Sequence, residues 1–178
     1  MFGCDWATCK SRVEAHFGPG FNFEEAYAIR TAYVRAYLEE HGVPVKPGLF
    51  ELLDVLDTRG IKKCVATSTA RSRADQLLST AGLRGRFGTL IGGDSVSRGK
   101  PHPDIFLTAA ETAGVKPENC LVLEDSAAGM EAAAAAGMRC IAVPDMSPPD
   151  AAASACVNAV CADLREAADV ILSCYTKG

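Results

Sequence analysis

The sequence of 178 residues lacks any long uninterrupted apolar run. No stretch approaches the ~18–20 residues that a membrane-spanning helix needs, and no basic segment followed by an apolar one opens the chain. We therefore expect neither a membrane span nor a signal peptide. The chain also lacks a cluster of Lys and Arg, and its net charge of −4 argues against nucleic acid as its main partner. With 48% hydrophobic residues, it is too apolar for a disordered segment.

Disulfide and zinc signatures are missing as well. The eight cysteines are spread along the chain, and none forms a Cys-x-x-Cys pair. Cys4 and Cys9, like Cys156 and Cys161, have four residues between them, but no pair of histidines lies nearby to complete a zinc site. We expect free thiols, which are typical of a reduced, cytoplasmic protein.

The first 44 residues show no strand signal. We predict two helices, over residues 6–17 and 23–40, separated by Phe17-Gly18-Pro19-Gly20, with Asn22 as the N-cap of the second. Apolar residues recur in the second helix at steps of three and four, which is the pattern of an amphipathic helix. We interpret this part as a small helical piece.

From Pro44 onward, predicted helices alternate with short apolar runs. The helices cover residues 49–59, 70–80, 104–113, 127–136 and 163–175, and the strands cover residues 61–66, 89–91, 120–123, 140–143 and 159–160. Four of the helices end at a glycine, where the chain needs a left-handed residue: Gly60, Gly82, Gly114 and Gly137. This alternation indicates an α/β fold with a parallel sheet and right-handed crossovers. We interpret residues 151–153 as a flexible connection.

Polar residues follow three of the predicted strands, where open parallel sheets bind ligands. Thr67-Ser68-Thr69 offers three hydroxyls before a helix N-terminus, which suits a phosphate group, although a plain N-cap is the alternative. Glu124 and Asp125 are adjacent carboxylates, which suit Mg²⁺. The alternative is that Asp125 or Ser126 caps a helix while Glu124 is solvated.

A lysine is held between a glycine and a proline in Gly99-Lys100-Pro101-His102-Pro103-Asp104-Ile105-Phe106. A fixed ammonium group beside carboxylates and a phosphate would stabilise a phosphoryl-transfer transition state. The alternative is a solvated loop lysine. We interpret His102 as a loop residue, because nothing in the sequence places a partner for it.

These three segments, in this order, resemble motifs two, three and four of the haloacid dehalogenase (HAD) superfamily, in its branch of small-sugar phosphatases and β-phosphoglucomutase-like enzymes. The resemblance implies a Rossmannoid parallel sheet with helices on both faces over residues 45–178, and a partial helical cap over residues 1–44. It also implies that Thr67 and Ser68 bind the phosphoryl group, that Lys100 bridges it to the nucleophile, and that Glu124 and Asp125 hold Mg²⁺. Asp94 matches an acidic position to which we give a supporting role.

The first motif of that superfamily, an Asp-x-Asp pair after the first strand, is absent from this sequence. No aspartate combines a preceding apolar strand with the Asp-x-Asp spacing, which excludes as substitutes Asp5, Asp54, Asp57, Asp145, Asp150 and Asp163. By the resemblance, the missing segment includes the central strand, so that the strands before Thr67 and Glu124 would face each other across a gap. We expect a chain truncated at its N-terminus, with no nucleophile, little activity and weakened Mg²⁺ binding.

The resemblance implies a Mg²⁺-dependent hydrolase of a small phosphorylated metabolite of the sugar-phosphate type, acting through an aspartyl-phosphate. The alternatives are a phosphomutase and a non-catalytic relative that binds phosphate or a partner. A receiver-like signalling domain ranks lower, because it lacks both the helical prefix and the Lys-Pro-x-Pro-Asp segment. The identity of the substrate and the oligomeric state lie beyond the sequence.

Overall fold

The computed structural model describes residues 6–18, 20–145 and 148–175, so Cys4 and Asp5 lie outside the described residues. Its helices are α1 (Trp6–Phe17), α2 (Phe23–His41), α3 (Leu49–Thr58), α4 (Arg71–Thr80), α5 (Asp104–Ala113), α6 (Ala127–Ala135), α7 (Ala151–Ser154) and α8 (Leu164–Tyr175). Its strands are β1 (Cys64–Ala66), β2 (Thr89–Ile91), β3 (Leu121–Glu124), β4 (Arg139–Ala142) and β5 (Ala159–Val160). Three short 3₁₀ turns complete it: η1 (Arg84–Arg86), η2 (Gly93–Ser95) and η3 (Pro117–Asn119).

Most of the predicted elements form where the sequence placed them. The four glycines that end helices have φ values between 63° and 69°, which confirms the left-handed residues predicted there. The prediction for residues 151–153 was wrong. They begin α7, because the Asp150 carboxylate accepts a hydrogen bond from the Ala153 backbone N–H at 2.9 Å and so caps a short helical turn.

The strands form two parallel sheets rather than one. β1 pairs with β2, and β3, β4 and β5 pair in that order. Val65 lies opposite Leu90 in the first sheet, and Val122 lies opposite Cys140 in the second. Among the described residues, β1 and β3 each have one hydrogen-bonded neighbour. Each of these two strands therefore has a free edge, on the side opposite its partner, to which no described strand is paired.

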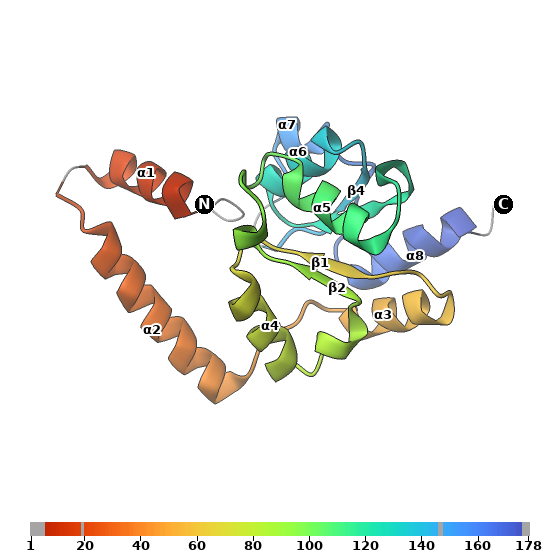
Figure 1. Cartoon of the computed structure of the whole chain (residues 1–178), viewed down its shortest axis with the longest axis horizontal. Coiled ribbons are helices and arrows are strands. Elements are labelled where there is room, and N and C mark those ends of the chain that lie inside the picture. The colour runs from red at the N-terminus through yellow and green to blue at the C-terminus, as the bar shows by residue number, and fades with distance from the viewer. Residues whose placement is uncertain (1–5, 19, 146–147, 176–178) are drawn as a thin grey trace.

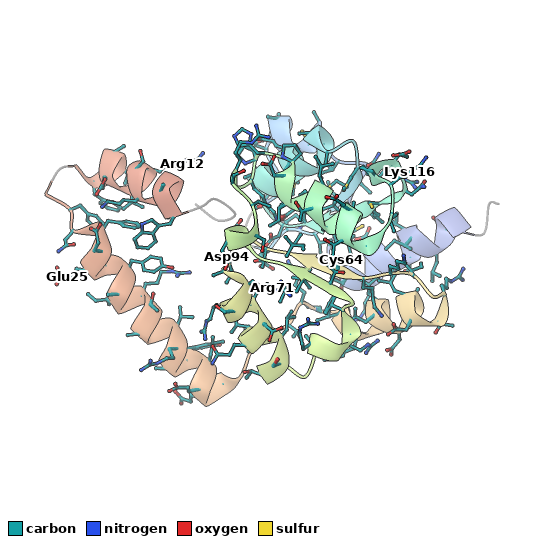
Figure 2. The ribbon with its side chains drawn as sticks, in the orientation of Figure 1. Arg12, Glu25, Cys64, Arg71, Asp94 and Lys116 are labelled. Carbon is teal, nitrogen blue, oxygen red and sulfur yellow. The ribbon has the colours of Figure 1, made fainter. Side chains whose placement is uncertain are left out.

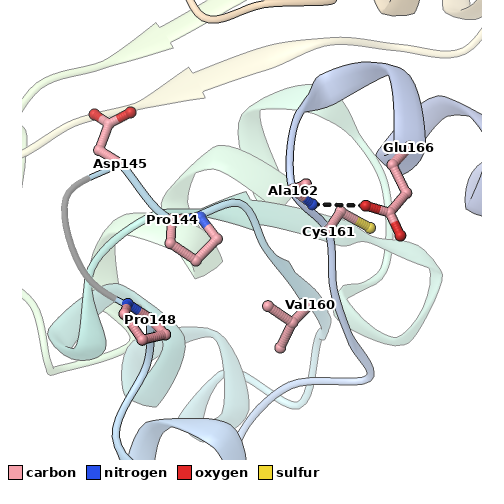
Figure 3. A pocket seen from close by; sticks show the side chains of 7 residues that line it. All are labelled: Pro144, Asp145, Pro148, Val160, Cys161, Ala162 and Glu166. Atoms are coloured by element: carbon pink, nitrogen blue, oxygen red, sulfur yellow. Dashed lines mark hydrogen bonds between the residues drawn. The ribbon is translucent and has the colours of Figure 1, made fainter.

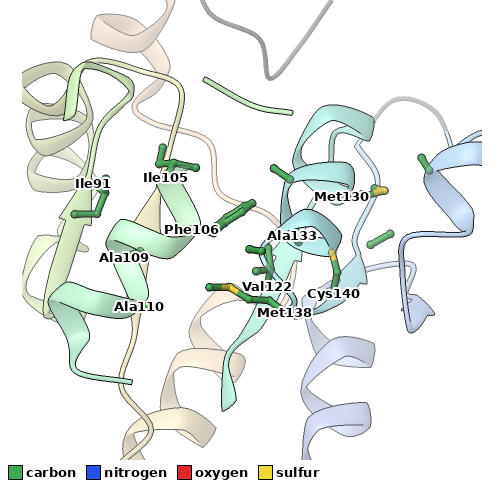
Figure 4. Packing of buried hydrophobic residues seen from close by; sticks show 14 residues of the cluster. Ile91, Ile105, Phe106, Ala109, Ala110, Val122, Met130, Ala133, Met138 and Cys140 are labelled. Carbon is green, nitrogen blue, oxygen red and sulfur yellow. The ribbon is translucent and has the colours of Figure 1, made fainter. Parts of the chain in front are cut away.

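Helices cover both faces of the β3–β4–β5 sheet, as predicted. On one face, α5 and α6 pack onto β3 and β4 through Phe106, Met130, Val122 and Cys140 (Figure 4). On the other face, α3 and α8 enclose Ile141 of β4. Helix α5 also packs against β1 and β2, so it contacts both sheets and helps to hold them together.

Helices α1 and α2 extend to one side of the α/β part (Figure 1). The Trp6 ring meets the rings of Phe23 and Tyr27 edge to face, with centroids 4.9 and 4.4 Å apart. The Asn22 side chain accepts a hydrogen bond from the Glu25 N–H, which confirms the predicted N-cap of α2. Within the described ranges, no helix combines the length and the apolar character needed to cross a membrane.

Candidate active site

The hydroxyl loop, Thr67-Ser68-Thr69, follows β1 directly. Its first residue continues the sheet, because the Thr67 N–H donates to the Ile91 carbonyl at 3.0 Å. The Thr67 hydroxyl accepts a hydrogen bond from the Thr69 N–H at 3.2 Å, which tightens the turn. The N-cap position of α4 is Ala70, whose side chain makes no capping bond, so the plain N-cap interpretation of the three hydroxyls was wrong.

The loop after β2 supports the hydroxyl loop. The Asp94 carboxylate accepts a hydrogen bond from the Arg71 N–H at 2.8 Å and so caps α4 from outside the helix. Figure 2 labels both residues. The Gly93 N–H donates to the Thr69 carbonyl at 2.9 Å. A Cβ at Gly93 would lie 2.4 Å from the Ser68 carbonyl oxygen, so only glycine allows this close approach.

Lys100 lies between the two sheets. Its side chain is 7% exposed, so the interpretation as a solvated loop lysine was wrong. Its Nζ forms an ion pair with Glu124 at the end of β3, and contacts the Ala66 carbonyl oxygen at the end of β1 at 3.4 Å. The same ammonium group lies 4.8 Å from the centre of the Phe106 ring. Lys100 therefore links the carboxyl ends of two strands that do not pair with each other.

Glu124 is buried, which makes the interpretation as a solvated residue wrong. One carboxylate oxygen contacts Lys100, and the other accepts hydrogen bonds from the Asp125 N–H at 2.8 Å and the Ser126 N–H at 3.2 Å. Burial raises the pKa of Glu124, but the charge and hydrogen bonds of Lys100 and the Asp125 N–H outweigh it, so the pKa lies below its usual value. Glu124 is therefore an ionised anchor for Lys100.

Helix α6 packs directly onto this carboxylate. A Cβ at Gly129 would lie 2.0 Å from Glu124 Oε1, so the helix approaches Glu124 closely only because residue 129 is glycine. The Ser126 side chain accepts a hydrogen bond from the Gly129 N–H, which confirms Ser126 as the cap that the sequence offered as one alternative. Both oxygens of Glu124 are thus engaged within the protein.

Asp125 is the more exposed carboxylate of the pair. Burial and the hydrogen bond and charge of Glu124 raise the pKa of Asp125, the Lys46 ammonium lowers it, and the Asp145 carboxylate raises it. Lys46 and Asp145 form an ion pair with each other. Sequence reasoning missed this ion pair, because Asp145 lies in a Pro-rich loop after β4 and Lys46 carries no local signal, its contact being 99 residues away in the chain.

The donor chemistry here suits a hard divalent cation. Mg²⁺ takes one or two carboxylates together with phosphate oxygens and water, and Asp125 and Asp145 lie within electrostatic range of each other. The described part of the chain contains no group of three or more His, Cys, Asp or Glu side chains that could enclose a metal by themselves. Any Mg²⁺ held here would thus depend on phosphate and water for the rest of its ligands.

A hollow of about 500 Å³ lies at the same edge, past the ends of β4 and β5. Its lining consists of Pro144, Asp145, Pro148, Val160, Cys161, Ala162 and Glu166. Figure 3 shows Asp145 at the rim, with its carboxyl group turned away from Val160 and Cys161. The hollow therefore adjoins the polar edge through Asp145.

Parallel strands flanked by helices, with polar side chains gathered at the carboxyl edge, define an open α/β protein, a class whose members bind ligands at the strand ends. Within that class, the chain belongs to the haloacid dehalogenase-like hydrolase family, whose profile matches residues 12–137. The match includes the hydroxyl loop, Lys100, Glu124 and Asp125.

Individual relatives point to one branch of the family. The chain is 32% identical over 144 residues to Protein CbbY of Rhodobacter capsulatus, covering 76% of this chain and 63% of that protein. It is 40% identical over 92 residues to the phosphorylated carbohydrates phosphatase of Thermotoga maritima, covering 52% of this chain and 43% of that protein. The crystal structure of CbbY from Rhodobacter sphaeroides in complex with xylulose-(1,5)bisphosphate superposes with a TM-score of 0.68 at 28% identity, covering 84% of this chain and 67% of that one. These relatives place the chain in the sugar-phosphate phosphatase branch.

The chain spans between 12% and 63% of the length of eight curated relatives that it matches. The activities and substrates of those longer proteins are therefore properties of those proteins, and the match does not by itself assign them to this chain.

Proposed function

We propose that this chain carries the phosphate-binding and cation-binding part of a Mg²⁺-dependent phosphoric-monoester hydrolase, which acts on a small phosphorylated metabolite of the sugar-phosphate type. One observation carries the proposal: a buried lysine, Lys100, is held by the Glu124 carboxylate at the edge where the hydroxyl loop and Asp125 also lie. A water-poor ammonium group at a strand end is suited to bind a phosphoryl oxygen. Relatives named as phosphatases support the choice of substrate class.

Each residue has a distinct part in this proposal. Thr67, with the backbone of Ser68, donates hydrogen bonds to the phosphoryl group, and Lys100 neutralises its charge. Glu124 holds Lys100 in place and with Asp125 forms the proposed cation site, where Asp125 is the direct ligand. Mg²⁺, when bound, would supply positive charge to the phosphate oxygens. We further propose that residues 1–44 are part of a cap over the edge of a core formed by residues 45–178.

The sequence contains no Asp-x-Asp pair to supply the nucleophile. Loss of a covalent nucleophile costs on the order of 10⁴–10⁶ in turnover. We therefore expect the 178-residue chain alone to release little phosphate from sugar phosphates, while still binding phosphate. Robust Mg²⁺-dependent phosphate release that Asp125→Asn abolishes would contradict this expectation.

The proposal is tested by binding of inorganic phosphate in the presence of MgCl₂, measured by isothermal titration calorimetry. Thr67→Val removes one hydroxyl with little change in shape, and we expect it to weaken binding by roughly tenfold, as for a hydrogen bond to a charged group. Thr80→Val, at the exposed end of α4, is the matched control and should bind like the parent chain. Equal phosphate affinity in all three proteins would remove the hydroxyl loop from the site.

The missing Asp-x-Asp pair favours a second candidate, a non-catalytic protein that binds a phosphorylated ligand through the same residues. Both candidates predict phosphate binding and little phosphate release by this chain alone. They differ in the turnover of a protein that also supplies an Asp-x-Asp pair, so a phosphate-release assay on such a protein separates them. Six described cysteines are free, which supports a reducing compartment such as the cytoplasm for either candidate.

A further inference from the structure

A second lysine reaches the polar edge from a distant part of the chain. Lys46 lies in the connection between α2 and α3, and its ammonium group donates to the Val143 carbonyl at 2.9 Å and pairs with the Asp145 carboxylate. Both partners come from the segment that directly follows β4. The Lys46 side chain is 27% exposed, so it lies across the edge of the sheet and is not a freely solvated side chain.

The backbone around Lys46 is fixed by its neighbours. The carbonyl of Pro47 accepts a hydrogen bond from the Leu164 N–H at 3.1 Å, at the start of α8. Gly48 has a φ of +83°, and a Cβ there would lie 2.4 Å from the backbone nitrogen of Arg165. This contact leaves no room for a side chain at position 48. The position of Lys46 is therefore set by the packing of its loop against α8.

The charge of Lys46 acts on the carboxylate proposed to bind the cation. Asp125 and Asp145 follow the ends of neighbouring strands, because Glu124 lies opposite Ala142 and the Val143 N–H donates to the Glu124 carbonyl at 2.8 Å. The ion pair with Asp145 therefore holds the Lys46 ammonium group beside the strand end that carries Asp125. The other lysine of the site, Lys100, is engaged by Glu124 and Ala66. Lys46 is thus positioned to neutralise the pair formed by Asp125 and Asp145.

We propose that the Lys46 ammonium group is the resident counter-ion of Asp125 and Asp145, and that a divalent cation must displace it to bind at this edge. The inference rests on the proposed function for the place of the cation, and adds that the chain itself sets how tightly the cation binds. Lys46 is in this sense a positioning residue, because it acts through the two carboxylates.

The test separates the charge of Lys46 from its hydrogen bonds. Lys46→Gln removes the charge but keeps a donor for the Val143 carbonyl, whereas Lys46→Arg keeps the charge. Binding of MgCl₂ to the full chain is measured by isothermal titration calorimetry, with KCl holding the ionic strength constant. Lys62→Met is the control, because Lys62 also donates to a backbone carbonyl, that of Ala113 at 2.7 Å, and that bond involves no carboxylate.

We expect Lys46→Gln to tighten Mg²⁺ binding by about fivefold, the factor that corresponds to a partly exposed ion pair. Lys46→Arg and Lys62→Met should stay within about twofold of the parent chain. Three results would overturn the proposal. The first is Mg²⁺ binding that is unchanged or weaker in Lys46→Gln, and the second is Mg²⁺ binding that tightens equally in Lys46→Arg. The third is the lack of any measurable Mg²⁺ binding in Lys46→Gln.

A further variant locates the ion. Asp125→Asn should remove Mg²⁺ binding from both the parent chain and Lys46→Gln. If Mg²⁺ binding survives in Asp125→Asn, the ion lies elsewhere and the role of Lys46 is wrong. Phosphate binding through Thr67 is measured separately, so the phosphate part of the proposed function can stand or fail independently of this result.

Discussion

The two sheets are built from similar short apolar runs and end up in different surroundings. In β3–β4–β5, the β4 residues Cys140, Ile141 and Ala142 are buried, because helices cover both faces. In β1–β2, Leu90 and Ile91 of β2 are buried, but all three residues of β1 are only half-buried. An apolar run is therefore buried to the extent that neighbouring elements supply a second layer, and the run itself does not decide this.

The join between the sheets coincides with the candidate site. No strand pairs β1 with β3 among the described residues, and the contacts across the join include those of α5 and of Lys100. A site built across such a join depends on a few polar contacts for its geometry. The predictions below test how much the join depends on each of these contacts.

The largest effect is expected from breaking the ion pair across the join. Lys100→Met would leave the Glu124 carboxylate buried without its cation, which should lower the free energy of unfolding by about 3–5 kcal/mol. Urea denaturation measures the change, and Lys100→Met/Glu124→Gln should recover part of it because no buried charge remains. Hydrogen exchange should show that β1 amides lose protection before β4 amides. A loss below about 1 kcal/mol in the single variant would show that Lys100 does not hold the join.

A smaller loss is expected from Gly129→Ala. Inside an ordinary helix, replacing Gly by Ala raises the free energy of unfolding by up to about 1 kcal/mol. Here the new Cβ would push the Glu124 carboxylate away from Lys100. We expect a destabilisation of about 1–3 kcal/mol by urea denaturation, as for an overpacked site. Gly85→Ala, which would meet no atom within 4 Å, is the control and should change stability little. A stabilised Gly129→Ala variant would mean that α6 adjusts without disturbing Glu124.

The support of the hydroxyl loop is tested by Asp94→Ala, which removes the cap of α4 supplied by the loop that follows β2. The expected loss is about 1 kcal/mol in the free energy of unfolding, the usual value of an N-cap. Asp94→Asn keeps an acceptor oxygen and should lose less. The midpoint of thermal unfolding is measured for the parent chain, Asp94→Ala and Asp94→Asn. Equal midpoints would show that the Arg71 N–H finds another acceptor.

The smallest effect depends on pH and is a gain in stability, whereas the three variants above lower stability. The pKa of Asp125 is raised in the folded chain, by burial first and then by Glu124, so the folded state holds this proton more readily than the unfolded state. The ionised carboxyl therefore lowers stability above its folded pKa, and the penalty fades as the pH falls. Asp125→Asn should raise the thermal midpoint at pH 7 without Mg²⁺, and the difference should vanish below about pH 3. A lowered midpoint at pH 7 would contradict this sign.

Much of the fold is local and was predicted from the sequence. Glycines at the helix ends, the Asn22 and Ser126 caps and the apolar runs of β2, β3 and β4 each act within a few residues, so their pattern is visible in the chain. The position of the hydroxyl loop and of Lys100 at strand ends followed from the same pattern. The strand predicted over residues 61–66 was too long, because only Cys64–Ala66 finds a partner in β2.

The sequence by itself determined the order of helices and strands, the residue types of the proposed phosphate site and the lack of an Asp-x-Asp pair. Tertiary structure alone decided that Glu124 is an anchor for Lys100, that Asp94 caps a helix to which it does not belong, and that Lys46 reaches Asp145. The physical reason is that local pattern fixes backbone conformation, whereas the charge state and partners of a side chain depend on groups that meet it only after the chain has folded.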